Sequence, residues 1–83
     1  MPAEIEVFSG PNCQNCEAAK QLLTDNGLTF VDRSIADPDQ LAELQHRLPR
    51  AMSIPQVFVD GEHIGNDDDL RIRYRDQRPP FAP

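Results

Sequence analysis

Two cysteines are the residues of this 83-residue chain best suited to chemistry. Cys13 and Cys16 are its only cysteines, and Gln14 and Asn15 lie between them. Small disulfide-stapled domains usually carry about four to eight cysteines, and a pair that closes so small a loop constrains the unfolded chain only weakly. The pair is therefore better placed for reversible thiol–disulfide exchange than for holding a fold together.

The local sequence predicts that this pair lies where a strand turns into a helix. Turn-forming residues 9–12 precede Cys13, and from about Cys13 onward apolar residues recur at helical spacing. The free N–H groups and partial positive charge of a helix N-terminus stabilise an anionic sulfur, so cysteines at such sites titrate at about 3.5–7.5 rather than near 8.5. We predict that Cys13 is the exposed nucleophile and that Cys16, one turn further on, is the more buried thiol that resolves a mixed disulfide.

A zinc site is the main chemical alternative for a Cys-x-x-Cys pair. It would need two further ligands, and His46 and His63 are the only histidines. Their spacing from the cysteines and from each other does not match a zinc finger. We predict that both histidines are ordinary surface residues and that no metal is bound.

The elements that must position the cysteines follow from periodicity and turn residues. We predict a strand over residues 4–8, a helix from about Cys13 to Asn26-Gly27, a strand over 28–35, a helix that begins at 37–40 and ends before Pro49, a strand over 56–59, a return strand from 63–64, and a helix from Asp67 or Asp68.

Several of these boundaries rest on single residues. Asp37 can cap the second helix while Gln40 completes a capping box, and Asp60-Gly61 is a strong hairpin turn. The third helix is expected to be short, because Pro79 stops it and the arginines at 71, 73, 75 and 78 leave little apolar surface. These arginines can pair with the acidic run at residues 67–69 or form a docking face for a partner.

Strand-helix-strand units pair in parallel and hairpins pair antiparallel, so the order predicts an α/β domain with a mixed four-stranded sheet and about three helices. We expect one domain over residues 1–83, with 78–83 as a frayed tail. The net charge of −6 argues against a nucleic-acid partner and favours basic protein surfaces. No apolar run is long enough for a membrane span, and the N-terminus lacks signal-peptide blocks, so we expect a cytoplasmic protein.

Pro55 opens a second informative segment, residues 53–59 (Ser-Ile-Pro-Gln-Val-Phe-Val). Taken alone, it indicates a trans proline at the start of a strand, where a missing N–H is tolerated. A cis bond would instead turn the backbone of Ile54 outward, where it can pair with an extended peptide-like substrate beside the cysteines.

Three motifs in order resemble the glutaredoxins: the Cys13–Cys16 pair at a helix start, residues 53–59, and residues 65–70 (Gly-Asn-Asp-Asp-Asp-Leu). The resemblance covers about residues 4–70 and implies a thioredoxin-like fold, a cis Pro55, and glutathione-linked reduction of protein or low-molecular-weight disulfides. It also implies that glutathione is held by the backbone of Ile54 beside Pro55, by the backbone of Asp67, and by the side chain of Asp68. A helix N-terminus suits the ligand's carboxylate, and an aspartate suits its ammonium.

This chain departs from the usual glutaredoxin pattern at several positions. Gly10 stands where a lysine usually helps to hold glutathione, Gln14-Asn15 replaces Pro-Tyr, and Asn66 replaces the second glycine of a Gly-Gly pair. Asparagine tolerates unusual backbone angles better than most residues. The missing lysine and the net charge of −6 predict a weaker attraction for anionic glutathione.

Two alternatives stay open beside glutathione-dependent reduction. An NrdH-type redoxin, reduced by thioredoxin reductase and serving ribonucleotide reductase, has similarly polar residues between its cysteines, but its usual Trp-Ser-Gly-Phe stretch is absent and this chain has no tryptophan. An iron–sulfur carrier would use Cys13 and glutathione as ligands at a dimer interface, although Cys16 departs from the usual monothiol pattern. We expect a monomer that acts on disulfide-containing proteins.

Overall fold

The structure, a computed structural model, describes residues 3–77, apart from the side chains of residues 76 and 77. Its elements are β1 (Ile5–Ser9), α1 (Gln14–Asp25), β2 (Val31–Ser34), α2 (Pro38–Arg47), β3 (Gln56–Val59), β4 (Glu62–Gly65) and α3 (Asp67–Gln77). The sheet has the order β2-β1-β3-β4. Strand β1 pairs with β2 in parallel and with β3 antiparallel, and β3 pairs with β4 antiparallel. The predicted α/β class with a mixed four-stranded sheet and three helices is confirmed.

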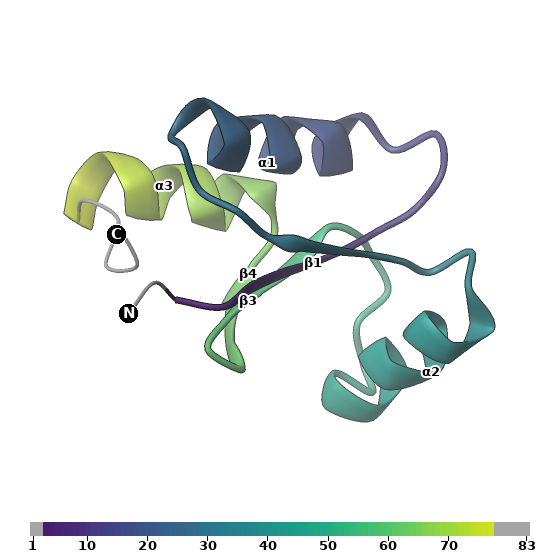
Figure 1. Ribbon diagram of the computed structural model, residues 1–83. Helices are drawn as coiled ribbons and strands as arrows, with labels where there is room; N and C mark the ends of the chain where they lie inside the picture. Colours follow the sequence, from purple (N-terminus) through teal and green to yellow (C-terminus); the bar gives the residue numbers. More distant parts are fainter. Residues whose placement is uncertain (1–2, 78–83) are drawn as a thin grey trace.

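Alternation along β1 divides the core between the two faces of the sheet. Ile5 and Val7 join Val57 and the buried residues of α1 and α3 in one cluster. Phe8 points to the opposite face, where it packs with Phe58 and with Leu44 of α2. Figure 1 shows the result: α1 and α3 lie together over one face, and α2 covers the other. The cysteine loop between β1 and α1 is thus fixed by both layers.

The two predicted helix starts behave differently in detail. The side chain of Cys13 caps α1, and Asp37 caps α2 by accepting a hydrogen bond of 2.9 Å from the Asp39 N–H. The predicted role of Gln40 is wrong, because its side-chain oxygen accepts a hydrogen bond of 3.2 Å from Arg33 instead of completing a capping box. The Gln40 side chain thus bonds to Arg33 on the neighbouring strand β2 rather than to the N-terminus of its own helix.

Strand β2 is shorter than the predicted strand over residues 28–35. Leu28 and Phe30 precede it and pack against the cluster under α1 and α3, while Ile35 follows it and packs on the α2 side. Val31 is 45% exposed because β2 is an edge strand. The apolar residues of this segment therefore reflect packing before and after the strand rather than a longer strand.

The predicted hairpin turn at Asp60-Gly61 is confirmed, whereas the predicted short length of the last helix is wrong. Asp60 and Gly61 both have positive φ, 52° and 82°, as a tight two-residue turn between β3 and β4 requires. Helix α3 is not short: it has 11 residues. Leu70 is fully buried and Tyr74 packs against the same core cluster, so two side chains one turn apart anchor this arginine-rich helix on the core. The tail predicted at 78–83 lies outside the described residues.

Candidate redox site

The two cysteines form a disulfide at the N-terminus of α1, with their Cα atoms 5.2 Å apart. Cys13 is the N-cap residue, in extended conformation, and its Sγ accepts a hydrogen bond of 3.1 Å from the Cys16 N–H. Cys16 is fully buried, whereas Cys13 is partly exposed. The sulfur that a substrate can reach is thus also the one that faces a helix N-terminus, where negative charge is favoured.

A cis-proline loop faces this sulfur. The peptide bond between Ile54 and Pro55 is cis, as the resemblance implied, and the carbonyl oxygen of Ile54 lies 3.9 Å from Cys13 Sγ. Pro55 is buried, which fixes the loop at the start of β3. Three of the site residues named from the sequence, Cys13, Ile54 and Pro55, therefore come together, although the loop is 41 residues from the cysteine along the chain.

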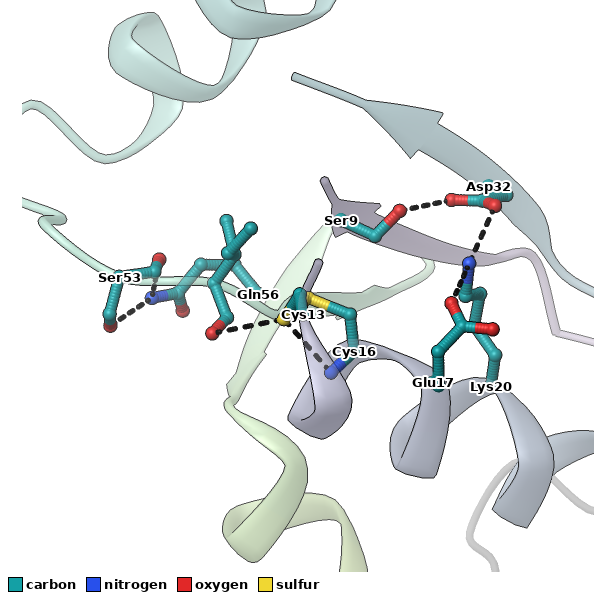
Figure 2. Close-up of a disulfide and its surroundings, with 9 residues drawn as sticks. Ser9, Cys13, Cys16, Glu17, Lys20, Asp32, Ser53 and Gln56 are labelled. Carbon is teal, nitrogen blue, oxygen red and sulfur yellow. Dashed lines mark hydrogen bonds and ion pairs between the residues drawn. A yellow bond between two sulfur atoms is a disulfide. The ribbon is translucent and has the colours of Figure 1, made fainter. Parts of the chain in front are cut away.

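The hydrogen-bonded side chains of Gln56 and His63 support this loop. Gln56 Nε2 donates to the carbonyl oxygen of Ser53 at 3.0 Å, and Gln56 Oε1 accepts a hydrogen bond of 2.7 Å from His63 Nε2. Figure 2 shows Ser53 and Gln56 on one side of the disulfide. The sequence predicted His63 to be an ordinary surface residue, and the residue is exposed, but its imidazole also packs against Phe58, with the two ring centres 5.2 Å apart and the rings tilted by 42°.

A second network, drawn on the other side of the disulfide in Figure 2, ties α1 to the sheet. Ser9 Oγ and Lys20 Nζ donate to the two oxygens of Asp32 at 2.5 and 3.0 Å, and Lys20 also pairs with Glu17 at 2.8 Å. Burial raises the pKa of Asp32, but the hydrogen bonds from Ser9 and Lys20 outweigh it and leave this pKa below its usual value. Hydrogen bonds to Glu17 and then Asp32 raise the pKa of Lys20. The network therefore stays charged at neutral pH.

The acidic residues predicted to bind glutathione lie in the first turn of α3. Asp67 is nearly buried and Asp68 is exposed, and Arg71 pairs with both carboxylates at 3.1 Å. This confirms the helical pairing predicted for one of the four arginines. Among the described residues, neither carboxylate has a hydrogen bond or ion pair to the cysteines. Asp67 lines a surface depression between α1 and α3.

The residues around that turn explain its sequence. Asn66 Oδ1 accepts a hydrogen bond from the Asp69 N–H, and Asp69 Oδ2 accepts one from the Asn66 N–H, both at 3.0 Å. This is a reciprocal cap, so Asn66 serves as a capping residue rather than as a stand-in for glycine. Gly65 has a φ of +130°, and a Cβ there would lie 2.6 Å from Asp69 Cγ, so the turn requires glycine at this position.

In the part of the chain that the structure describes, no three His, Cys, Asp or Glu side chains gather in a way that could hold a metal ion. None of the helices within residues 3–77 is both long and apolar enough to cross a bilayer.

The geometry defines a class of protein. A disulfide at the start of α1, opposite a cis-proline loop at the start of β3, on a sheet of order β2-β1-β3-β4, is the arrangement of a redox protein with the thioredoxin-like fold.

Comparison with known proteins narrows this class to a family. The sequence model of the glutaredoxin family, described as "Glutaredoxin", matches residues 5–64. Glutaredoxin 3 of Escherichia coli is 32% identical over 72 residues, which cover 82% of each chain. Hybrid peroxiredoxin hyPrx5 of Haemophilus influenzae is 39% identical over 66 residues, and the match covers 80% of this chain but only 27% of that protein.

A solved structure agrees with the sequence relatives. The crystal structure of a buckwheat glutaredoxin–glutathione complex has a TM-score of 0.81 and 26% identity, and the match covers 96% of this chain and 76% of that one. The chain belongs to the glutaredoxin family, a family of thiol–disulfide oxidoreductases with the thioredoxin-like fold.

Proposed function

We propose that the protein reduces protein disulfides and mixed disulfides of glutathione, with glutathione as its reductant. The observation that carries the proposal is the partly exposed Cys13 sulfur, which accepts the N–H of Cys16 at a helix N-terminus and faces the carbonyl oxygen of Ile54. An N–H aimed at sulfur stabilises a thiolate, and an open backbone carbonyl beside it can pair with an extended substrate.

Exchange at Cys13 is proposed to begin in the reduced protein. The Cys13 thiolate attacks the glutathione sulfur of a mixed disulfide, so that a Cys13–glutathione disulfide forms while the substrate disulfide breaks and the protein thiolate leaves. The thiolate of a second glutathione then attacks the glutathione sulfur of this intermediate. Oxidised glutathione leaves, and the Cys13 thiolate is regenerated.

Cys16 is proposed to act when the substrate is a disulfide within a protein. Its thiolate attacks Cys13 in the mixed disulfide, which releases the fully reduced substrate and closes the Cys13–Cys16 disulfide. Two glutathione molecules then supply the two electrons that reopen it. The full burial of Cys16 suits this role, because only a substrate already joined to Cys13 comes within its reach.

The proposed glutathione contacts are the backbone of Ile54 beside Pro55, the backbone of Asp67 and the side chain of Asp68. The glutaredoxin–glutathione complex among the structural neighbours supports glutathione as ligand. Arg71 bears on this proposal, because it pairs with Asp68 at 3.1 Å. A ligand ammonium would share the exposed Asp68 carboxylate with this guanidinium. A cytoplasmic location stays a prediction of the sequence.

Cysteine variants test the proposed division of roles. We expect the activity of Cys13→Ser on every disulfide to be at least about 1,000-fold lower than that of the unmodified protein, because the nucleophile is absent. Cys16→Ser should keep measurable reduction of a glutathione mixed disulfide and lose reduction of protein disulfides. The measurement is turnover coupled to glutathione and glutathione reductase, with circular dichroism as the control for folding.

The same assay discriminates between reductants. Turnover of the unmodified protein with glutathione and glutathione reductase supports the proposal. Turnover only with thioredoxin reductase would identify a redoxin that does not use glutathione. An active Cys13→Ser variant would show that the reacting sulfur is not the one named here.

A further inference from the structure

An apolar groove begins at the loop that faces the reactive sulfur. It has a volume of about 240 Å³ and lies between that loop and α2. Its main lining residues are Ile35, Leu41, Leu44, Leu48, Met52 and Ile54. None of the described residues that line it carries a charge, and Ile54 belongs both to the groove and to the cis-proline loop. The groove is thus continuous with the proposed substrate site.

The approach from the cysteine loop to this groove is apolar as well. A Cβ on Gly10 would lie 2.8 Å from Ile54 Cδ1 and 3.2 Å from Ile35 Cγ1. The side chains of Ile54 and Ile35 therefore occupy the space that a side chain at position 10 would fill. Gly10 is thus part of the packing beside this groove, and none of the described residues that line the groove is a cation.

Met52 stands at the rim of the groove. It is 97% exposed, whereas the other exposed large apolar residues of the described chain, Val31 and Ile72, are 45% and 49% exposed. It lies two residues before Ile54, in the segment that leads to the cis-proline loop. A flexible and polarisable methionine on a surface adapts well to different apolar partners.

We propose that this groove receives an apolar side chain next to the substrate cysteine, and that Met52 closes over it. The inference rests on the proposed exchange at Cys13. An extended segment paired with the backbone of Ile54 points successive side chains to opposite sides, so a neighbour of its cysteine turns toward the groove. Small-molecule pockets usually measure about 300–1,000 Å³, so a smaller groove suits a single large side chain.

Charge separates this substrate class from glutathione. The residue that follows cysteine in glutathione is a terminal glycine, which has no side chain to fill the groove and whose carboxylate would find no cation among the described residues that line it. A carboxylate placed on such a surface loses hydration without gaining a partner. The structure therefore points to protein segments with a large apolar residue beside the cysteine as better substrates than segments with small polar neighbours.

Two symmetrical disulfides test this inference on the full chain, each joining two copies of one of two matched cysteine peptides, so that Cys13 attacks a peptide sulfur rather than a glutathione sulfur. In one peptide leucine flanks the cysteine on both sides, and in the other serine does. We expect kcat/KM to be about 10-fold higher for the leucine peptide, the size of effect that one apolar group gives in a pocket. In Met52→Ser the ratio of the two kcat/KM values should fall below about 3-fold, and Met52→Leu should restore it.

Ile72→Ser provides the matched control, because Ile72 is also exposed but lies on α3. It should keep the full preference. Equal kcat/KM for both peptides in the unmodified protein, or an undiminished preference in Met52→Ser, would overturn the inference while leaving the proposed function intact. Failure to reduce either peptide would overturn the proposed function and this inference with it.

Discussion

Glu6 is a carboxylate held in the middle of β1, on the face of the sheet that α2 covers. It is 3% exposed and accepts hydrogen bonds of 2.8 Å from Arg33 Nε and 3.0 Å from Arg47. The Arg47 guanidinium also lies 4.9 Å from the ring centre of Phe58. The hydrogen bond from Arg47, with that from Arg33, outweighs burial and lowers the pKa of Glu6. A charge can stay buried here because its oxygens have partners.

A pH-dependent loss of stability follows from this lowered pKa. The contribution of Glu6 is fully present above the ordinary pKa of about 4.5 that the residue has in the unfolded chain, and it is lost as pH falls through the lower folded-state pKa. We expect Glu6→Gln to reduce the free energy of unfolding by about 1.5–3 kcal/mol at pH 7, and by clearly less near pH 3. Urea unfolding at the two pH values measures this difference.

Glu43→Gln is the matched control for that experiment. Glu43 pairs with the same Arg47 at 2.7 Å, but from the exposed side of α2. Its removal should have a much smaller effect at neutral pH, because exposed pairs are well solvated. A Glu6→Gln effect of the same size at both pH values would show that the carboxylate acts through its shape rather than its charge.

At the scale of elements, strand β4 supports the loop before β3. His63 on β4 donates to Gln56 at the start of β3, and Gln56 in turn donates to the Ser53 carbonyl. Gln56 is only 8% exposed, so water cannot easily replace a lost partner. The loop that faces Cys13 therefore depends on a strand that does not touch the cysteines by any hydrogen bond among the described residues.

His63→Leu should destabilise the protein by about 1–3 kcal/mol, because it leaves the side-chain Oε1 of the largely buried Gln56 without its hydrogen-bond donor. His46→Leu on α2, an exposed histidine at the surface, should change stability by less than about 0.5 kcal/mol. Chemical denaturation at pH 7.5 measures both variants. Equal effects of the two substitutions would contradict a supporting role for His63.

At the scale of the whole molecule, acidic charge dominates. The net charge is −6, and near the reactive sulfur Glu17 helps to line a surface depression that Cys13 shares with Gly10 and Gln14. Summed charge of one sign steers the approach of small ions, and salt screens it within about 10 Å at 0.1 M. Cationic disulfides are therefore attracted to this surface and anionic ones are repelled.

Salt should change the relative rates for two small disulfides of opposite charge. At low ionic strength we expect kcat/KM for cationic cystamine to be raised and that for anionic oxidised glutathione to be lowered. Increasing sodium chloride from 0.02 to 0.5 M should therefore reduce their ratio severalfold. A stopped-flow assay of the reduced protein measures both rates. A ratio of the two rates that does not depend on salt would mean that the net charge of the protein does not affect the approach of disulfides to Cys13.

Local signals in the sequence determined much of this fold. The start of α1 at the cysteines, the Asp37 cap, the Asp60-Gly61 turn and the alternation of β1 each depend on residues only a few positions apart. Such short-range preferences act in nearly any tertiary context. The cis state of Pro55 needed more, because its own residues fit a trans proline equally well and only the resemblance to a family implied the cis bond.

Only the tertiary structure decided which side chains meet. Glu6 can be buried because Arg47, 41 residues away along the chain, donates a hydrogen bond to it. The Gln40 side chain bonds to Arg33 rather than to the end of its own helix. Helix α3 extends to Gln77 because Leu70 and Tyr74 pack against the core cluster. The groove beside Ile54 likewise joins Ile35, which follows β2, to residues of α2 and of the loop before β3. Burial and pairing depend on contacts between distant segments, and a sequence pattern specifies the face that a residue occupies but not the partner it meets there.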